Sequence, residues 1–394
     1  MTISKKMQSI LNQLFYLQDI SKDIEISKKK YGDNNIYDFT QEYPDISPSK
    51  KFYEALIKVA EDKRKGLHAY MPNTGIQYVR KAVADYLTQE QQIEFTENDV
   101  VMTYGSSGGF NIIFKTILDP GDEVIVSAPY FPYYSFYVDN HEGKLKSVPS
   151  QVDFSLNIDA ISSAITKHTK AIIINSPNNP TGKIYSRNAL NELKSILLQK
   201  SKLMNRSILL IIDETYRKIN YENNDVPKYL NLYNNSIIIS SYSKDMSVPE
   251  ERIGFLAVNP KIEQKQNLIY GLSHNNRILG FVNAPSLMQR TFASLQGQSI
   301  DIASLKEKRN LLCDGLKDCD YEFILPSGSF YVFPKTPIPD DTKFIKNLQD
   351  EKIFALPGNI FGCPGYFRLN FCVKSNTINK AIPIFKKMKE KYNT

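Results

Sequence analysis

The chain has 394 residues, of which 42% are hydrophobic and 23% are charged, values typical of a soluble globular protein. Its length favours two domains, because single hydrophobic cores stop growing at about 250–300 residues. No run approaches the ~20 apolar residues that cross a bilayer, and the N-terminal residues lack a signal-peptide pattern. The net charge of +7 comes partly from lysine runs at 28–30 and 385–391, which are typical of solvated helix faces and accompany no nucleic-acid-binding motif. We therefore expect no membrane and no nucleic-acid partner.

The four cysteines lie in the last quarter of the chain, and their spacing matches neither a zinc site nor a CxxC motif. We expect reduced, mostly buried thiols, no bound metal and a cytoplasmic location. The cysteines are Cys313, Cys319, Cys363 and Cys372.

The chain begins with helical patterns and then changes to alternating strands and helices. Helices are expected over 3–19, 49–61 and 77–87, with a polar loop after the first and a turn-rich segment at 68–75. From residue 100 onward, apolar strands alternate with helices, which favours a mostly parallel sheet covered on both faces. The strands are expected at 100–103, 123–126, 171–174, 208–212 and 237–239, and the helices from 110 and at 156–166 and 187–200.

The rest of the chain has a different strand spacing and indicates a second, smaller α+β domain. We expect residues 1–50 to pack with this small domain, residues 51–285 to form the large domain and residues 286–394 to form the small one. The expected helices are 261–271, 286–296, 301–317, 342–350 and 376–391, and the expected strands are 329–333 and 366–371.

Polar residues follow several of the predicted strands directly, at 175–182, 213–216 and 240–244. In open α/β sheets, ligands bind beyond the carboxyl ends of the strands, so one ligand is reached by several of these loops. The small residues at 104–109 come between a strand and a helix, where backbone amides and the helix dipole attract an anion. These residues indicate either a phosphate site or simply a tight turn, which needs the same residue types.

Lys244 stands at the end of a buried strand, where an ammonium group is costly to desolvate without a partner. The position suits a lysine whose neutral amine forms an imine with a carbonyl compound, and Arg252, eight residues on, would help to lower the pKa of that amine. The alternative is a surface lysine at a strand end.

Five stretches together resemble the class I/II aminotransferases, which have the type I fold of pyridoxal 5'-phosphate enzymes. The resemblance extends from about residue 37 to the C-terminus and is closest to the bacterial aspartate-aminotransferase-like branch. It implies a large domain with a seven-stranded, mostly parallel sheet. It also implies a homodimer with shared active sites that moves an amino group from an amino acid to a 2-oxo acid by a ping-pong mechanism. The five stretches are 104–109 (YGSSGG), 175–182 (NSPNNPTG), 213–216 (DETY), 241–244 (SYSK) and 252–254 (RIG).

The resemblance also implies roles for single residues. Lys244 would bind the cofactor covalently and then shuttle a proton, Asp213 would pair with the pyridine nitrogen, and Tyr216 and Asn179 would hydrogen-bond the ring oxygen. The phosphate-binding group would consist of Gly105, Ser106, Ser107, Ser241 and Arg252.

Three further residues have roles by the same resemblance. Phe131 would stack on the cofactor ring, with packing in the core as the equal alternative. Tyr70 would reach the phosphate of the neighbouring subunit. Arg368 would bind the α-carboxylate of the substrate as a bidentate pair.

Two glutamates depart from the family pattern, since Glu42 and Glu250 stand where the branch usually has glycine. Glu42 lies in a loop that normally approaches the substrate, so it would repel an acidic substrate or attract an amine-bearing one, unless both side chains point to solvent. Two other functions stay open: a lyase or another reaction at Cα on the same fold, and a non-catalytic regulator. The regulators of this kind carry an N-terminal helix-turn-helix domain, for which the segment before residue 37 is too short.

Overall fold

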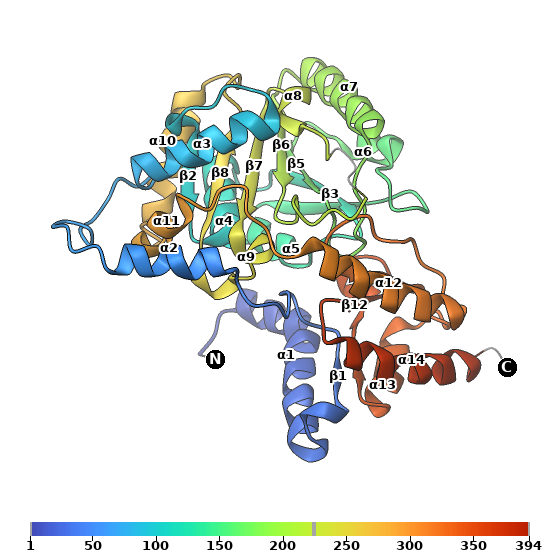
Figure 1. Cartoon of the computed structure of the whole chain (residues 1–394). Coiled ribbons are helices and arrows are strands. Elements are labelled where there is room, and N and C mark those ends of the chain that lie inside the picture. The colour runs from blue at the N-terminus through green and yellow to red at the C-terminus, as the bar shows by residue number, and fades with distance from the viewer. Residues whose placement is uncertain (1, 223–225, 393–394) are drawn as a thin grey trace. The chain divides into compact units, whose positions relative to one another are not determined.

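The computed structural model describes residues 2–222 and 226–392, and the chain forms two compact units (Figure 1). The large unit consists of Tyr43–Ala303 and Pro326–Ser329. The small unit consists of Met1–Glu42, Ser304–Leu325 and Phe330–Thr394.

The large unit is built on a seven-stranded sheet, counted over the described residues, with the strand order β2-β8-β7-β6-β5-β3-β4. Strand β8 is antiparallel to both of its neighbours, and all other neighbouring pairs are parallel. The mostly parallel sheet predicted from the sequence is therefore confirmed. The strands are β2 (Val100–Thr103), β3 (Glu123–Ala128), β4 (Lys144–Pro149), β5 (Thr169–Asn175), β6 (Leu209–Asp213), β7 (Ser236–Ser241) and β8 (Gly254–Val258).

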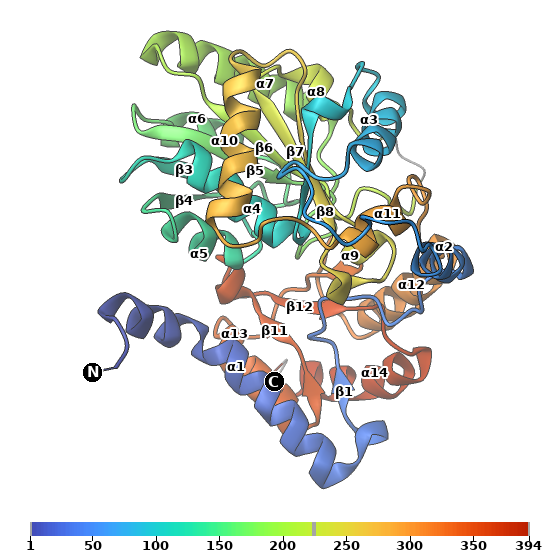
Figure 2. The same cartoon turned by 90° about the vertical axis from the view of Figure 1, so that its left-hand side faces the viewer.

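The central strands are apolar on both faces, and alternate residues enter two separate cores. Ile237 and Ile239 of β7 pack in one core, while Ile238 between them packs in the other. The first core is covered by α4 (Gly105–Ile117), α5 (Tyr133–Asp139) and α10 (Lys265–Ile278). The second is covered by α2 (Lys50–Ala60), α3 (Gln77–Gln91), α6 (Ile158–Ala164), α7 (Arg187–Met204), α8 (Tyr229–Leu232) and α11 (Ser286–Phe292), so that helices flank the sheet on both sides (Figure 2).

Several elements of the large unit differ from the sequence prediction, among them the short helices α5, α8 and α9 (Tyr242–Asp245), which were not predicted. Strand β4 was missed because it is an edge strand whose lysines give it a polar pattern, and β8 was missed because its apolar run is short and follows a charged segment. Helix α4 begins at Gly105 rather than at residue 110, because Gly105 (φ 67°) turns the chain directly from β2 into the helix. The small residues at 105–109 are thus the first turn of the helix.

The small unit contains two short sheets. Strands β11 (Leu356–Pro357), β12 (Phe367–Asn370) and β9 (Tyr331–Val332) form an antiparallel sheet in that order, and β1 (Tyr37–Asp38) pairs in parallel with β10 (Ile353–Phe354). Helix α1 runs well beyond the predicted segment, from the Ser4 cap to Gly32, so most of the expected polar loop is helical. The helices are α1 (Lys5–Tyr31), α12 (Ile302–Asp318, which starts in the large unit), α13 (Asp341–Asp350) and α14 (Ser375–Glu390).

The chain divides between the units after residues 42 and 303, whereas the sequence analysis placed the limits after 50 and 285. The second difference arises because Met288, Phe292 and Leu295 are buried in the core of the large unit, where α11 packs against α2 and α3.

Over the described ranges, no helix is long and apolar enough to cross a membrane, and no group of acidic, histidine and cysteine side chains is arranged to hold a metal ion.

Candidate active site

The polar segments predicted to meet at one edge of the sheet do so. Strand β6 ends at Asp213 and lies between β5, which ends at Asn175, and β7, which ends at Ser241. Asn175 and Asp213 are direct neighbours in the register of β5 and β6. Lys244 follows in the short helix α9 (Tyr242–Asp245), which begins immediately after β7. The carboxyl ends of three adjacent strands therefore carry the candidate residues.

Asp213 is a buried carboxyl group held by three hydrogen bonds. Thr215 donates to Oδ1 from its hydroxyl at 2.5 Å and from its backbone N–H at 3.1 Å, and the Tyr134 hydroxyl donates to Oδ2 at 2.6 Å. Burial raises the pKa of Asp213 above the ordinary carboxyl value, while these hydrogen bonds and the positive charge of Lys244 act in the opposite direction. Burial thus outweighs the hydrogen bonds and Lys244, so the charged form of Asp213 would gain from a further cationic group beside it.

The sequence analysis missed Tyr134, which is fully buried on α5. Its ring packs against Phe110 with the centroids 4.9 Å apart and edge-on against Phe131 at 5.5 Å. Burial and the neighbouring Asp213 raise the pKa of the Tyr134 hydroxyl well above the ordinary tyrosine value, so it stays a hydrogen-bond donor. The aromatic run at 130–137 drew attention to Phe131, and no local pattern distinguishes the tyrosine that contacts the carboxylate.

A second residue missed from the sequence, Asn175, orients the loop that carries Asn179. Its side-chain N–H donates to the backbone carbonyl of Asp213 at 3.2 Å, and its side-chain oxygen accepts from the Asn179 backbone N–H at 2.7 Å. Asn179 is buried within this loop, and Tyr216 is buried in the turn three residues after Asp213. Both predicted ring-oxygen ligands are therefore fixed in place by the ends of β5 and β6.

The start of α4 forms a site for an anion together with Arg252. A Cβ atom at Gly105 would lie 2.7 Å from Nη2 of Arg252, so a larger residue would displace the guanidinium, and the φ of 67° at this position also favours glycine. The pairing of Thr103 with Gly254 between β2 and β8 brings the two segments together, and Arg252 Nη1 donates to the Pro249 carbonyl at 2.6 Å. Backbone amides, the helix dipole and an arginine converge here, which suits a phosphate group.

Ser241 supplies a further polar atom at the end of β7. Its hydroxyl oxygen is buried and has no hydrogen-bond partner among the described residues. A buried hydroxyl without a partner costs about 1–3 kcal/mol, so such an atom indicates a ligand or water that completes its hydrogen bonding. Ser106 and Ser107 lie in the first turn of α4 and are half-buried.

Three other predicted residues of the large unit, Phe131, Tyr70 and Glu250, differ in their exposure. Phe131 is half-buried, packs against the core that α4 and α5 cover, and contacts Tyr134, which bonds Asp213. Tyr70 is 91% exposed in the loop between α2 and α3. Glu250 is exposed, in agreement with the alternative that its side chain points to solvent.

Arg368 is the centre of a separate polar group in the small unit. It lies in β12 with no exposed surface, and its guanidinium stacks over the rings of Tyr331 and Phe361 at 4.3 and 5.1 Å. Its Nη2 donates to the Thr40 carbonyl at 2.9 Å, and its Nη1 lies 3.3 Å from the Glu42 carboxylate. For Glu42, the solvent-pointing alternative is therefore wrong, because its half-exposed side chain forms an ion pair.

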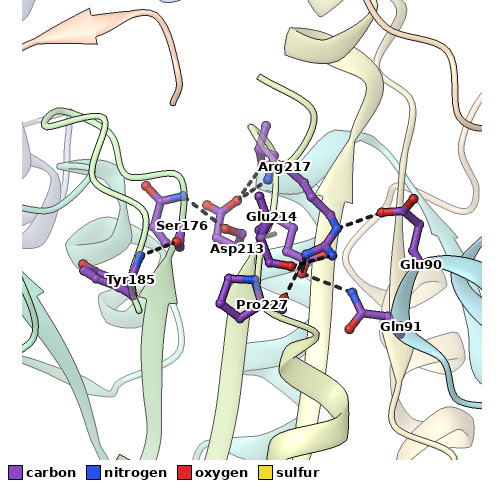
Figure 3. A network of polar contacts seen from close by, with 11 residues as sticks. Glu90, Gln91, Ser176, Tyr185, Asp213, Glu214, Arg217 and Pro227 are labelled. Carbon is purple, nitrogen blue, oxygen red and sulfur yellow. Dashed lines mark hydrogen bonds and ion pairs between the residues drawn. The ribbon is translucent and has the colours of Figure 1, made fainter. Parts of the chain in front are cut away.

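Behind Asp213, the next residue anchors a buried charge network (Figure 3). Glu214 accepts hydrogen bonds from Arg217 at 2.8 Å and from Gln91 at 3.3 Å, and Arg217 also donates to Glu90 at 3.1 Å. Burial raises the pKa of Glu214, and Arg217 opposes this rise. The network joins α3 to the turn after β6 and so holds the segment that carries Asp213 and Tyr216.

Comparisons with known proteins agree with this geometry. The family aminotransferase class I and II matches residues 33–384. A probable aspartate aminotransferase of Methanocaldococcus jannaschii is 29% identical over 88% of this chain and 92% of that protein. A probable aspartate/prephenate aminotransferase of Thermus aquaticus is 30% identical over 82% of this chain and 84% of that protein. The crystal structure of an amino transferase from Eubacterium rectale superimposes with a TM-score of 0.96 at 33% identity, with both chains covered completely.

The chain belongs to the class I and II aminotransferase family. It is a pyridoxal-phosphate-dependent aminotransferase, as the sequence analysis expected, and the lyase and regulator alternatives are not favoured by any of these comparisons.

The donor groups of the large unit fit pyridoxal 5'-phosphate. The cofactor has an aldehyde, which needs an amine, and a basic ring nitrogen, which needs a carboxylate. Its dianionic phosphate needs several hydrogen-bond donors. Lys244 and Asp213 provide the first two. The start of α4, Arg252 and the Ser241 hydroxyl, which lacks a hydrogen-bond partner within 2–222 and 226–392, provide hydrogen-bond donors for the phosphate.

Proposed function

We propose that Lys244 binds the cofactor aldehyde and that its amine, once released by an incoming amino acid, carries the proton at the reacting carbon. A primary amine next to the carbon that it serves avoids the entropy cost of recruiting a base from solution. The position of Lys244 directly after β7, within electrostatic reach of Asp213 at the end of the neighbouring strand, supports this role.

We propose that Asp213 holds the protonated ring nitrogen, because a buried carboxylate gains most from a cationic partner. When bound, the cofactor supplies an electron sink for the carbanion that forms at the substrate Cα. Tyr134 and Thr215 keep the Asp213 carboxylate oriented and favour its charged form. Tyr216 and Asn179 would hydrogen-bond the ring oxygen, and Phe131 would cover the ring face. The phosphate would be bound by Gly105, Ser106, Ser107, Ser241 and Arg252.

The substrate is an α-amino acid or a 2-oxo acid, and we propose that Arg368 binds its α-carboxylate. An arginine buried in a strand is rare without a specific partner, and its planar donor pair matches a carboxylate. The relatives named aspartate aminotransferase make L-aspartate the first amino donor to test.

We further propose a cytoplasmic homodimer. The large aromatic side chains of Tyr53, Tyr70 and Tyr78 are exposed on α2, α3 and the loop between them, which is consistent with a surface covered by a second copy. Tyr70 is the residue expected to reach the partner's phosphate. The cysteines are free thiols, as is usual in the reducing cytoplasm.

The observation that carries the proposal is the buried Asp213 carboxylate, held by Tyr134 and Thr215 beside the strand that leads to Lys244. The test is to mix the coloured holoenzyme with a panel of amino acids, L-aspartate included, and to follow the cofactor spectrum. A donor should shift the spectrum and release its 2-oxo acid, and a 2-oxo acid should then restore the first spectrum. Release of carbon dioxide or ammonia without this return would instead identify another reaction at Cα.

A further inference from the structure

Glu42 and Arg368 form an ion pair between the two ends of the chain, 326 residues apart in sequence. Glu42 Oε1 lies 3.3 Å from Nη1 of Arg368, and the Thr40 carbonyl accepts from Nη2 at 2.9 Å. The Arg368 side chain is fully buried, whereas that of Glu42 is 41% exposed. Of the two partners, Glu42 is therefore the one that can move into solvent.

Aromatic rings and the segment that carries Glu42 surround the Arg368 guanidinium. The rings of Tyr331 and Phe361 cover the guanidinium, and Asn370 on the same strand donates to the Gln41 carbonyl at 2.9 Å. Removing an anion that lies beside a buried guanidinium is strongly destabilising. Glu42 supplies such an anion, and its chemistry is the same as that of an amino acid's α-carboxylate.

We propose that Glu42 is a built-in competitor for Arg368, which a carboxylate ligand has to displace before it can bind. The inference rests on the proposed function in one respect, the role of Arg368 as the α-carboxylate ligand. Glu42 thus sets the affinity of the enzyme for its substrates through the arginine, and it is a specificity-determining residue rather than a catalytic one.

The consequence follows from linkage. When a ligand can bind Arg368 only after Glu42 has moved away, its binding free energy is reduced by the free energy of the Glu42–Arg368 pair. Removing the Glu42 charge should therefore raise the affinity of Arg368 for every carboxylate that binds there. An exposed ion pair would change affinity by less than about fivefold, and a fully buried one by much more. With one buried and one half-exposed partner, we expect about tenfold, which corresponds to about 1.4 kcal/mol.

The test compares Glu42→Gln with the matched control Glu351→Gln. Glu351 belongs to the same unit, is 35% exposed and forms an ion pair with Lys387 at 2.7 Å, but it does not contact Arg368. Two measurements are made on holoenzyme: steady-state kinetics with one amino donor, and binding of propionate, a carboxylate without an amine, followed by competitive inhibition and by the ligand-induced rise in Tm. Glu42→Gln should lower both KM and the propionate inhibition constant about tenfold and leave kcat within about twofold. Glu351→Gln should leave all three unchanged.

Two further variants make the result decisive. Glu42→Asp keeps the charge on a shorter side chain and should give a propionate affinity between those of the wild type and Glu42→Gln. If Glu42→Gln folds poorly, Glu42→Asp replaces it in the comparison with the wild type. Arg368→Gln should weaken propionate at least tenfold. If Arg368→Gln has no effect on KM or propionate, the proposed role of Arg368 is wrong. If Arg368→Gln weakens binding but Glu42→Gln leaves it unchanged or weaker, the role of Arg368 stands and the competitor proposal is overturned.

Discussion

The hydrogen bond from Tyr134 to Asp213 gives a prediction whose size and pH dependence both follow from the structure. Tyr134→Phe removes one hydroxyl and leaves the ring packing against Phe110 and Phe131 intact. A hydrogen bond to a charged group contributes about 1.5–3 kcal/mol, and one between neutral groups about 0.5–1.5 kcal/mol. In the apoenzyme, the free energy of unfolding should therefore fall by about 1.5–3 kcal/mol at a pH where Asp213 is ionised.

The loss should become smaller as the pH falls. Burial places the pKa of Asp213 in the fold above its unfolded value, so the folded state binds the extra proton and this group's contribution to stability decreases as pH rises between the two values. Without the Tyr134 hydroxyl, the charged form is less stabilised and the folded pKa rises further. The difference between wild type and variant is therefore largest at high pH and approaches the neutral-bond value once Asp213 is protonated.

The assay is urea unfolding of both apoenzymes at one protein concentration, at pH 8 and at the lowest pH at which both remain folded. Tyr233→Phe is the control, because the buried Tyr233 hydroxyl donates to the neutral Ile208 carbonyl at 2.8 Å. It should cost about 0.5–1.5 kcal/mol at both pH values. A loss from Tyr134→Phe that equals the control, or that does not change with pH, would show that Asp213 is not the hydrogen-bonded carboxylate described here.

Three other predictions concern the cofactor site and its support. Gly105→Ala should weaken pyridoxal phosphate binding at least tenfold in an absorbance titration, because the new Cβ meets a guanidinium nitrogen at 2.7 Å; Gly121→Ala, with the same sign of φ and open space around it, should leave the affinity unchanged. Arg217→Met leaves Glu214 buried without its cation and should cost about 3–5 kcal/mol in urea unfolding, and a loss below 1 kcal/mol would contradict the network in Figure 3. Lys244→Ala should leave the circular dichroism spectrum unchanged but abolish both the visible absorbance of the bound cofactor and turnover. An unchanged visible spectrum would show that Lys244 does not bind the cofactor.

The sheet was predictable because its central strands are continuous apolar runs, a pattern that depends only on local sequence. Strand β4 escaped notice since an edge strand is solvated, and its lysines at 144 and 146 resemble a loop. The first helix was predicted too short because its second half is mostly polar and charged, with few apolar residues to show a helical period. The lysines at 28–30 favour the C-terminal end of this helix through its dipole.

The residues at the strand ends were predictable from motifs, whereas their partners were not. Tyr134 and Asp213 are 79 residues apart and meet only because α5 and β6 belong to the same unit. Glu42 was noticed as an unusual residue, but its contact with Arg368 depends on the fold of the small unit and could not be derived from either segment alone. Local pattern thus points to candidate residues at the strand ends, and tertiary structure determines which side chains contact them.

The most direct test of the account is to find the residue that carries the cofactor. Holoenzyme is treated with borohydride, which fixes the cofactor permanently to the amine that holds it, and the digested protein is analysed by peptide mass spectrometry. The peptide containing Lys244 should carry the added mass of the reduced cofactor. A label on a different lysine, with Lys244 unmodified, would contradict it.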